Sequence, residues 1–159
     1  MASKEQYEYY KFLYDHERSR YLELVNRGKL FLSIITLYMG LLAVGADKTI
    51  TGLESSILLT LVYFISVFLL VASLVAVVIA IGIYRNEKPS NPREMILALK
   101  DYVPTDDEFR DERIVDLAVA TDRNSKNNDL RAKRLQVSSY LLILGILGQA
   151  LFLYLYVIN

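Results

Sequence analysis

Few side chains in this sequence have a type and spacing that could support catalysis. His16 is the one histidine of the chain, and its segment DHER lacks both the second histidine of a zinc-protease helix and a paired base. Asp106, Asp107 and Glu108 could bind a cation, but acidic residues equally suit the first turn of a helix. The chain has no cysteine, which excludes disulfides and thiolate metal sites. We therefore predict no catalytic, cofactor-binding or metal-binding residues.

The charge balance argues against a nucleic-acid partner, and the positions of the glycines argue against a phosphate-binding loop. The chain has 18 basic and 18 acidic residues, so its formal net charge is zero and no nucleic-acid partner is expected. Its glycines lie mainly in or beside long apolar runs and form no phosphate-binding loop. Gln149 is the one strongly polar side chain in the middle of such an apolar run.

Tyrosines are concentrated in the charged segment YEYYKFLYDHERSRY, residues 7–21. They could form an aromatic belt at a membrane surface, a platform on which a nucleotide stacks, or the seam of a helix that packs on another helix. Tyr7, Tyr14 and Tyr21 are seven residues apart, and Tyr10 lies at the complementary position of the same heptad. This spacing places the four rings on one face of a helix.

Three long runs without charged residues follow this segment, at 30–46, 57–84 and 137–158. Their lengths are compatible with membrane-spanning helices, the first at the short end and the second with room for tilt. In a chain of 159 residues too little polar sequence remains to cover three such helices in a soluble fold. We therefore predict an all-α membrane protein with three transmembrane helices.

The distribution of lysine and arginine predicts the orientation of these spans. Residues 1–29 carry six basic residues and residues 85–136 carry eleven, whereas the short connection 47–56 carries only Lys48. Because basic residues accumulate on the cytoplasmic side, the N-terminal helix and segment 85–136 are expected in the cytoplasm. The connection 47–56 and the C-terminus are then external. This arrangement is that of a multi-pass membrane protein.

The two expected cytoplasmic segments contain signals for helix starts. Ser3 with Gln6, and Thr105 with Glu108, have the spacing of a capping box. Between them, Asn91 and the proline after it predict a short helix that ends near residue 102. We expect the N-terminal helix and the helices of 92–136 to form a cytoplasmic helical bundle.

No helix breaker occurs between Asp106 and the third apolar run, so 106–158 is predicted to be one helix. Its first part carries an apolar stripe that includes Phe109 and Leu117, on which the tyrosine seam could pack. The stretch 122–133 is polar on all sides and includes Asn124 and Asn128. Asparagine has a weak helix propensity, so this stretch is expected to need partners.

The expected spans lack the charged residues that mark proton relays and ion-coupled transporters, which argues against a transporter. They do contain small residues at helix-packing spacing, which let helices approach closely. These faces could pack within one chain or between chains. Gln149 is the best candidate in the spans for a self-association contact or a pore lining.

The layout resembles small bacterial membrane effectors of anti-phage defence operons, the group that includes SLATT-domain proteins and transmembrane effectors of cyclic-nucleotide systems. The residues that carry the resemblance are ERSRYLELVNRGKLFLSIIT at 17–36 and NSKNNDLRAKRLQVSSYLL at 124–142, where the cytoplasmic helices enter the first and last spans. The resemblance implies a protein that oligomerises and permeabilises or depolarises the inner membrane. It also implies that a cytoplasmic protein partner or a cyclic-nucleotide signal triggers this change.

The leading hypothesis is thus a non-enzymatic, homo-oligomeric membrane effector that is triggered through its cytoplasmic helices. The alternative is a membrane-anchoring or scaffold subunit that docks a soluble partner enzyme. Tyr7 lies about 35 Å along a helix from the first span, too far for an aromatic belt, although nucleotide stacking stays open. The residues predicted to mediate assembly or interaction are Tyr7, Tyr10, Tyr14, Tyr21, Phe109, Leu117, Asn124, Asn128 and Gln149.

Overall fold

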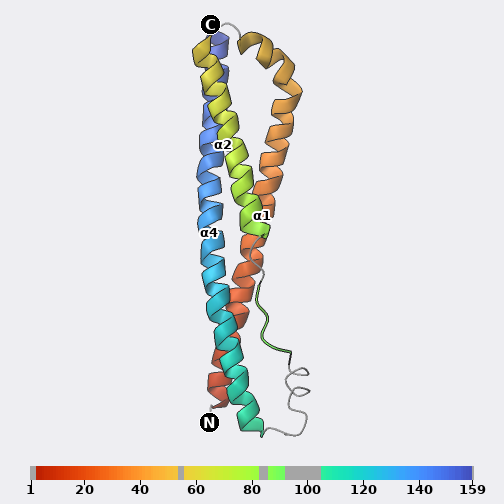
Figure 1. Ribbon diagram of the computed structural model, residues 1–159, viewed down its shortest axis with the longest axis vertical. Coiled ribbons are helices and arrows are strands. Elements are labelled where there is room, and N and C mark those ends of the chain that lie inside the picture. Colours follow the sequence, from red (N-terminus) through yellow and green to blue (C-terminus); the bar gives the residue numbers. More distant parts are fainter. Residues whose placement is uncertain (1–2, 54–55, 83–85, 92–104, 159) are drawn as a thin grey trace. The chain divides into compact units, whose positions relative to one another are not determined.

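A computed structural model describes residues 3–53, 56–82, 86–91 and 105–158 of the chain. In these ranges the regular structure is entirely α-helical and consists of three helices (Figure 1). Helix α1 is Lys4–Leu53, helix α2 is Ile57–Gly82 and helix α4 is Asp106–Ile158. The prediction of an all-α protein is confirmed for this part of the chain.

Both predicted capping boxes are present. The Ser3 amide donates to Gln6 Oε1 at 2.8 Å and the Gln6 amide donates to Ser3 Oγ at 3.2 Å. At the start of α4, the Thr105 amide donates to Glu108 Oε2 at 2.9 Å, and the Glu108 amide donates to Thr105 Oγ1 at 3.4 Å. These reciprocal bonds satisfy amides that a helix start leaves without an intrahelical partner.

The lengths of the helices agree with the prediction at α4 and differ from it at α1. Helix α4 is continuous over 106–158, as its lack of breakers predicts. Helix α1 ends at Leu53, so most of the connection 47–56 is helical rather than a loop. No proline interrupts this segment, and glycine alone weakens a helix by only about 1 kcal/mol. The expected helix of residues 92–102 lies outside the described residues.

Two of the described helices, α2 and α4, are long and apolar enough to cross a membrane. The apolar part of α4 lies in its C-terminal half, and α2 is apolar from end to end. Length and composition therefore indicate membrane association for this protein.

The chain divides into two compact units. The first, here called the polar unit, comprises Met1–Leu24 and Tyr84–Leu130. The second, here called the apolar unit, comprises Val25–Ile83 and Arg131–Asn159. Helices α1 and α4 contribute to both units, whereas α2 belongs to the apolar unit alone.

In the polar unit, the first part of α1 packs along the first part of α4. Tyr14, Leu117 and Ala120 form a buried cluster, and Tyr7 and Tyr10 pack against it. The rings of the predicted seam thus bury apolar area on the predicted stripe of α4, within one chain. Residue numbers rise together across the contacts of this pair, so the two helices run in the same direction.

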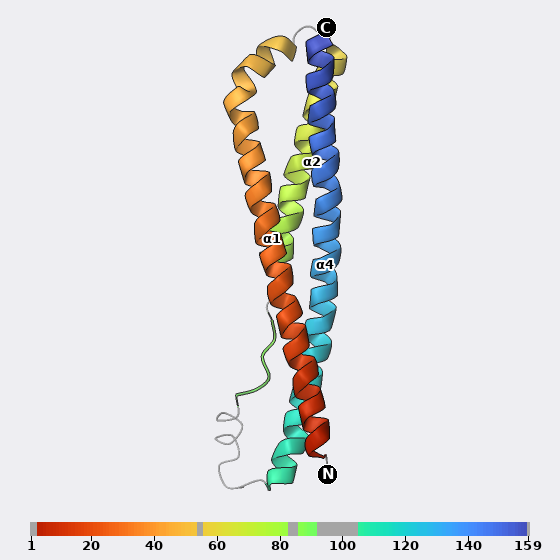
Figure 2. The same cartoon turned by 180° about the vertical axis from the view of Figure 1, so that it is seen from behind.

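In the apolar unit, α2 and α4 lie side by side in both views of the molecule (Figure 2). Their buried residues recur at intervals of three and four, or their sum of seven, as in a coiled coil. In α2 they are Leu59, Ser66, Leu70, Ser73, Val77 and Ala80. Leu59 packs on Phe152, and Ser73 bonds to Ser138. Since α2 numbers fall as α4 numbers rise, this helix pair is antiparallel.

Candidate functional site

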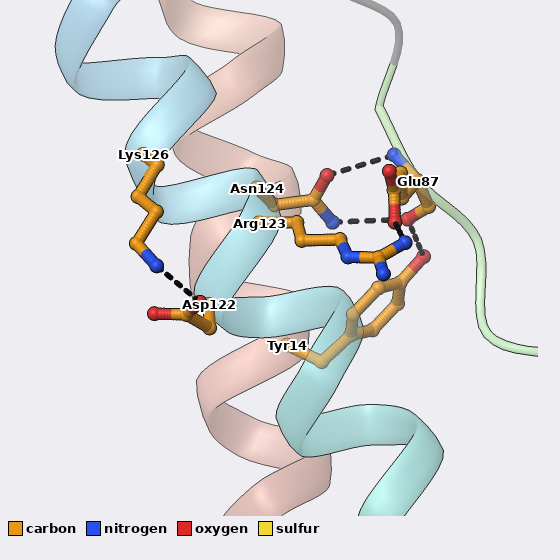
Figure 3. A network of polar contacts seen from close by, with 6 residues as sticks. All are labelled: Tyr14, Glu87, Asp122, Arg123, Asn124 and Lys126. Carbon is orange, nitrogen blue, oxygen red and sulfur yellow. Dashed lines mark hydrogen bonds and ion pairs between the residues drawn. The ribbon is translucent and has the colours of Figure 1, made fainter.

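The most specific polar contacts of the polar unit hold a short extended segment, residues 86–91, here called the strap. Asn124 of α4 has only 1% of its surface exposed and binds the strap at Glu87. The Glu87 amide donates to Asn124 Oδ1 at 2.7 Å, and Asn124 Nδ2 donates to the Glu87 carbonyl oxygen at 2.9 Å (Figure 3). One side-chain amide thereby satisfies both backbone groups of Glu87, as a neighbouring β-strand would.

Three further contacts reach the strap. The Tyr14 hydroxyl donates to the same Glu87 carbonyl oxygen at 3.5 Å, at the long end of the hydrogen-bond range (Figure 3). Arg123 pairs with the Glu87 carboxylate at 3.1 Å, and Arg113 donates to the Ser90 carbonyl oxygen. The Arg123 pair is exposed on both sides, so it stabilises the strap little.

Asn128 fastens the two helices of the polar unit to each other. It is 1% exposed, and its Nδ2 donates to the Glu17 carbonyl oxygen at 2.9 Å and to Glu17 Oε2 at 2.8 Å. One step further, Arg20 pairs with Asp129 at 2.6 Å and with Glu17 at 3.5 Å. The hydrogen bond to Asp129 raises the pKa of the Arg20 guanidinium.

These contacts explain how the polar stretch 122–133 persists as a helix. We expected it to be polar on all sides and to need partners, and Asn124 and Asn128 have such partners in the strap and in α1. Lys126 and Asp122 pair on the exposed side at 2.7 Å (Figure 3). Buried asparagines whose hydrogen bonds are satisfied fix the axial register of a helix pair more strictly than an apolar seam does.

Three of the other predicted residues of the polar unit, Tyr7, Tyr10 and Phe109, line two cavities. Tyr7 and Phe109 line one of about 230 Å³, together with two arginines. The other has a volume of about 340 Å³, with Tyr10, His16 and Asp122 in its wall. His16 is exposed and stacks on the Phe12 ring at a centroid distance of 6.3 Å. Tyr21 is half-buried in the same unit.

In the apolar unit, the polar side chains of the two helices face one another. Ser73 and Ser138 lie with their hydroxyl oxygens 2.9 Å apart, and each hydroxyl also contacts the other residue's carbonyl oxygen. Gln149 Nε2 donates to Ser66 Oγ at 2.7 Å, and the Ser66 hydroxyl in turn donates to the Tyr63 carbonyl oxygen at 2.8 Å.

Gln149 is the best candidate in the spans for a self-association contact or a pore lining, and the structure places it in a contact within one chain. Its side chain is 2% exposed and is turned toward α2 of the same chain. The physical reason is the serine on the facing helix, because a buried amide in an apolar unit is stable only when it finds a partner. Such a partner cannot be located from the sequence of α4 alone.

Two glycines of α4 allow this close approach. A Cβ atom at Gly148 would lie 2.7 Å from Ser66 Cβ, and one at Gly145 would lie 2.8 Å from two side-chain carbons of Leu70. Real Cβ atoms do not approach this closely, so the neighbouring atoms of α2 or the helices themselves would have to shift. The small residues seen in the sequence thus serve helix packing within one chain at these positions.

Arg131 is a buried residue that the sequence analysis did not identify. It is 1% exposed, and its Nε donates to the Ala80 carbonyl oxygen at 2.9 Å. Ala80 lies two residues before the end of α2. The last carbonyls of a helix lack intrahelical partners and carry partial negative charge, which a guanidinium satisfies. Its position four residues before Leu135 in the buried pattern of α4 is the signal that could have revealed it.

The described polar contacts hold the strap and the helices of each unit together. Within the described residues, no three His, Cys, Asp or Glu side chains lie close enough together to hold a metal ion. Of the acidic cluster at the start of α4, Asp107 pairs with Arg110 at 3.2 Å and Glu108 closes the capping box. Comparison with known proteins gives no match to any family model, curated protein or solved structure.

Proposed function

We propose that this chain is a non-enzymatic, self-associating membrane effector, in which a cytoplasmic polar unit receives a trigger and the apolar unit acts on the bilayer. In line with the resemblance in its sequence, its role would be anti-phage defence by permeabilising or depolarising the inner membrane. The observation that carries the proposal is the continuity of α1 and α4. Each is one uninterrupted helix with residues in the polar unit and residues in the apolar unit.

Membrane insertion is supported by where apolar and polar side chains lie in the apolar unit. Ser66, Ser73, Ser138 and Gln149 are buried between α2 and α4, whereas large apolar side chains point outward. On α2 and α4 these include Phe68 at 70%, Leu61 at 55% and Leu147 at 59% exposed. In water such a surface is costly, but in lipid it meets hydrocarbon.

A third span in α1 is part of the proposal. Leu30, Ile34, Leu37 and Leu41 follow one another at intervals of four and three and are all exposed, whereas Ile35 is fully buried. An outward apolar stripe with an apolar inner position suits a helix between lipid and protein. With three spans, the basic residues of 1–29 and 85–136 place both segments in the cytoplasm and the C-terminus outside.

Topology can be tested directly, because the chain has no cysteine. Single cysteines are introduced at Ser90 and at Ile158 and probed in whole spheroplasts with a membrane-impermeant maleimide. We expect labelling at Ile158→Cys from outside and labelling at Ser90→Cys only after the membrane is opened. Labelling of both sites from outside contradicts three spans with a cytoplasmic N-terminus.

Effector function is tested by expressing the chain alone and with its operon neighbours while membrane potential and growth are followed. We expect triggered depolarisation, and we expect Tyr14→Ala to abolish it while the protein stays in the membrane, because Tyr14 is buried in the polar unit's core. Tyr9→Ala is the matched control, since Tyr9 lies on the same helix and is 59% exposed. Absence of depolarisation and of growth arrest under every trigger refutes effector function.

A membrane-anchoring or docking subunit is the second candidate, and one observation favours it. The polar unit exposes large apolar side chains on its outer faces, with Tyr9 and Phe12 on α1 and Val115 and Val119 on α4. Exposed apolar side chains on a two-helix unit suit a protein partner. Co-purification of a soluble enzyme that is lost in Phe12→Ser, combined with no conductance in liposomes, would identify this function instead.

A further inference from the structure

Four side chains of the polar unit are occupied by the strap alone. Within the described part of the chain, Tyr14, Arg113, Arg123 and Asn124 make all their side-chain hydrogen bonds and ion pairs with the strap. We call these four residues the strap site. Figure 3 shows three of them converging on Glu87 from α1 and α4. The strap site thus fits an extended segment that offers a backbone amide, a carbonyl oxygen and a carboxylate at one position.

The strap adds no buried side chain to the polar unit in return. None of residues 86–91 is buried, and none belongs to the buried cluster around Tyr14. Lys88 precedes Pro89, and a residue before proline is sterically confined to extended conformations. Leaving the strap site therefore does not open the apolar cluster. Because Lys88 is already restricted, less conformational entropy is lost when the strap binds again.

We propose that the strap of one copy of this chain binds the strap site of another copy, so that copies associate by strap exchange. This inference rests on the proposed self-association and names the contact that carries it. Every copy has both a strap and a strap site, so a second copy is an occupant whose chemistry fits. Exchange of an identical element is a low-cost route to oligomers, because the contacts of one chain are formed again between chains.

The burial of Asn124 favours exchange over simple release of the strap. Asn124 is 1% exposed, and departure of the strap without a replacement removes both partners of its amide. In strap exchange these bonds are restored by the incoming segment. Since the contacts are the same within and between chains, the balance depends on the effective concentration of neighbouring copies. Strap exchange should therefore increase with the density of the protein.

The absence of cysteine from the chain allows a direct test with two differently tagged copies. One copy carries Glu87→Cys in the strap and the other carries Arg123→Cys in the strap site, at positions whose side chains pair at 3.1 Å. The full-length copies are co-expressed, purified in a neutral detergent and treated with a short bismaleimide. We expect a cross-linked heterodimer that carries both tags.

A matched control replaces Arg123→Cys with Asp122→Cys in the receiving copy. Asp122 is the neighbouring residue and pairs with Lys126 on the side of α4 away from Glu87 (Figure 3). This combination should give much less heterodimer. Equal yields from the Arg123→Cys and Asp122→Cys copies, or no heterodimer from either, overturn strap exchange.

Asn124→Ala separates strap exchange from mere proximity of two copies. In the copy that carries Arg123→Cys it weakens the receiving strap site by two hydrogen bonds and should lower the heterodimer yield about tenfold. In the copy that carries Glu87→Cys it leaves the receiving strap site intact and should lower the yield far less. Circular dichroism verifies that each variant keeps its helical content. Equal losses from the two placements overturn strap exchange.

Light scattering of the purified wild type separates this proposal from the proposed function. If the wild type is monomeric, self-association itself is refuted and strap exchange falls with it. If the wild type is oligomeric but Glu87→Cys and Arg123→Cys give no heterodimer, strap exchange alone is refuted.

Discussion

Replacing Asn124 with alanine should release the strap while leaving the helices intact. The change removes the two bonds to Glu87, of 2.7 and 2.9 Å, from a side chain that is 1% exposed. Each such bond contributes about 1 kcal/mol net, and the Glu87 backbone groups then lose their partner in a partly buried position. The Tyr14 bond of 3.5 Å is too long to compensate. We expect opening of the strap to become more favourable by about 2–3 kcal/mol.

Limited proteolysis with an enzyme that cleaves after glutamate measures this opening at the Glu87–Lys88 bond. When opening and closing are fast relative to cleavage, the cleavage rate follows the population of the open strap. A change of 2–3 kcal/mol corresponds to a rise in rate of about 30- to 150-fold. Mass spectrometry of the fragments distinguishes this bond from the other glutamate sites.

Two control variants make the result specific to the Asn124 amide. Asn127→Ala changes the same residue type on the same helix, outside the described hydrogen bonds of the strap, and should leave the rate near the wild-type value. Arg123→Gln removes only an exposed ion pair, worth about 0–1 kcal/mol, so the rate should rise at most about fivefold. If Asn124→Ala changes the rate no more than Arg123→Gln does, the strap is not held by the asparagine and the reasoning fails.

Three further predictions concern the apolar unit, each measured by thermal unfolding in detergent with circular dichroism. Gly148→Ala should destabilise it by about 1–3 kcal/mol because the new methyl group would lie 2.7 Å from a side-chain carbon of α2. Gly40→Ala is the control and should not destabilise it, since a Cβ atom at Gly40 would have nothing within 4 Å. Equal effects of the two variants would refute the close contact. A double-mutant cycle of Ser73→Ala and Ser138→Ala should give a coupling of about 0.6–1.7 kcal/mol, and additive effects would contradict the pair. Arg131→Leu should cost about 1.5–3 kcal/mol through the lost bond to a carbonyl oxygen of α2, and a stability equal to the wild type would show that the guanidinium does not cap this helix.

Local patterns in the sequence predicted the parts of the fold that depend on neighbours along the chain. The capping boxes at Ser3 and Thr105 and the uninterrupted helix over 106–158 follow from residues three to a few tens of positions apart. The seven-residue spacing of Tyr7 and Tyr14 likewise located the buried face of α1.

The positions of the polar side chains depend on distant partners, and the sequence pattern did not reveal them. Asn124 binds a backbone 37 residues away, and Gln149 binds Ser66, 83 residues away. Arg131 looks like a surface residue in a basic stretch until the end of α2 supplies a carbonyl oxygen for it. A buried polar group is stable only with such a partner, so its orientation is decided by tertiary packing rather than by periodicity.

The way in which Asn124 holds the strap has a consequence for sequence variation. The asparagine recognises the amide and the carbonyl group of position 87, which every amino acid except proline presents. Position 87 can therefore drift freely among related chains as long as proline is avoided, because its own side chain adds only an exposed ion pair. Position 124 needs both a donor and an acceptor on a short side chain, a requirement that asparagine meets and aspartate does not. Substitutions should therefore be strongly restricted at position 124 of the helix and widely accepted at position 87 of the strap.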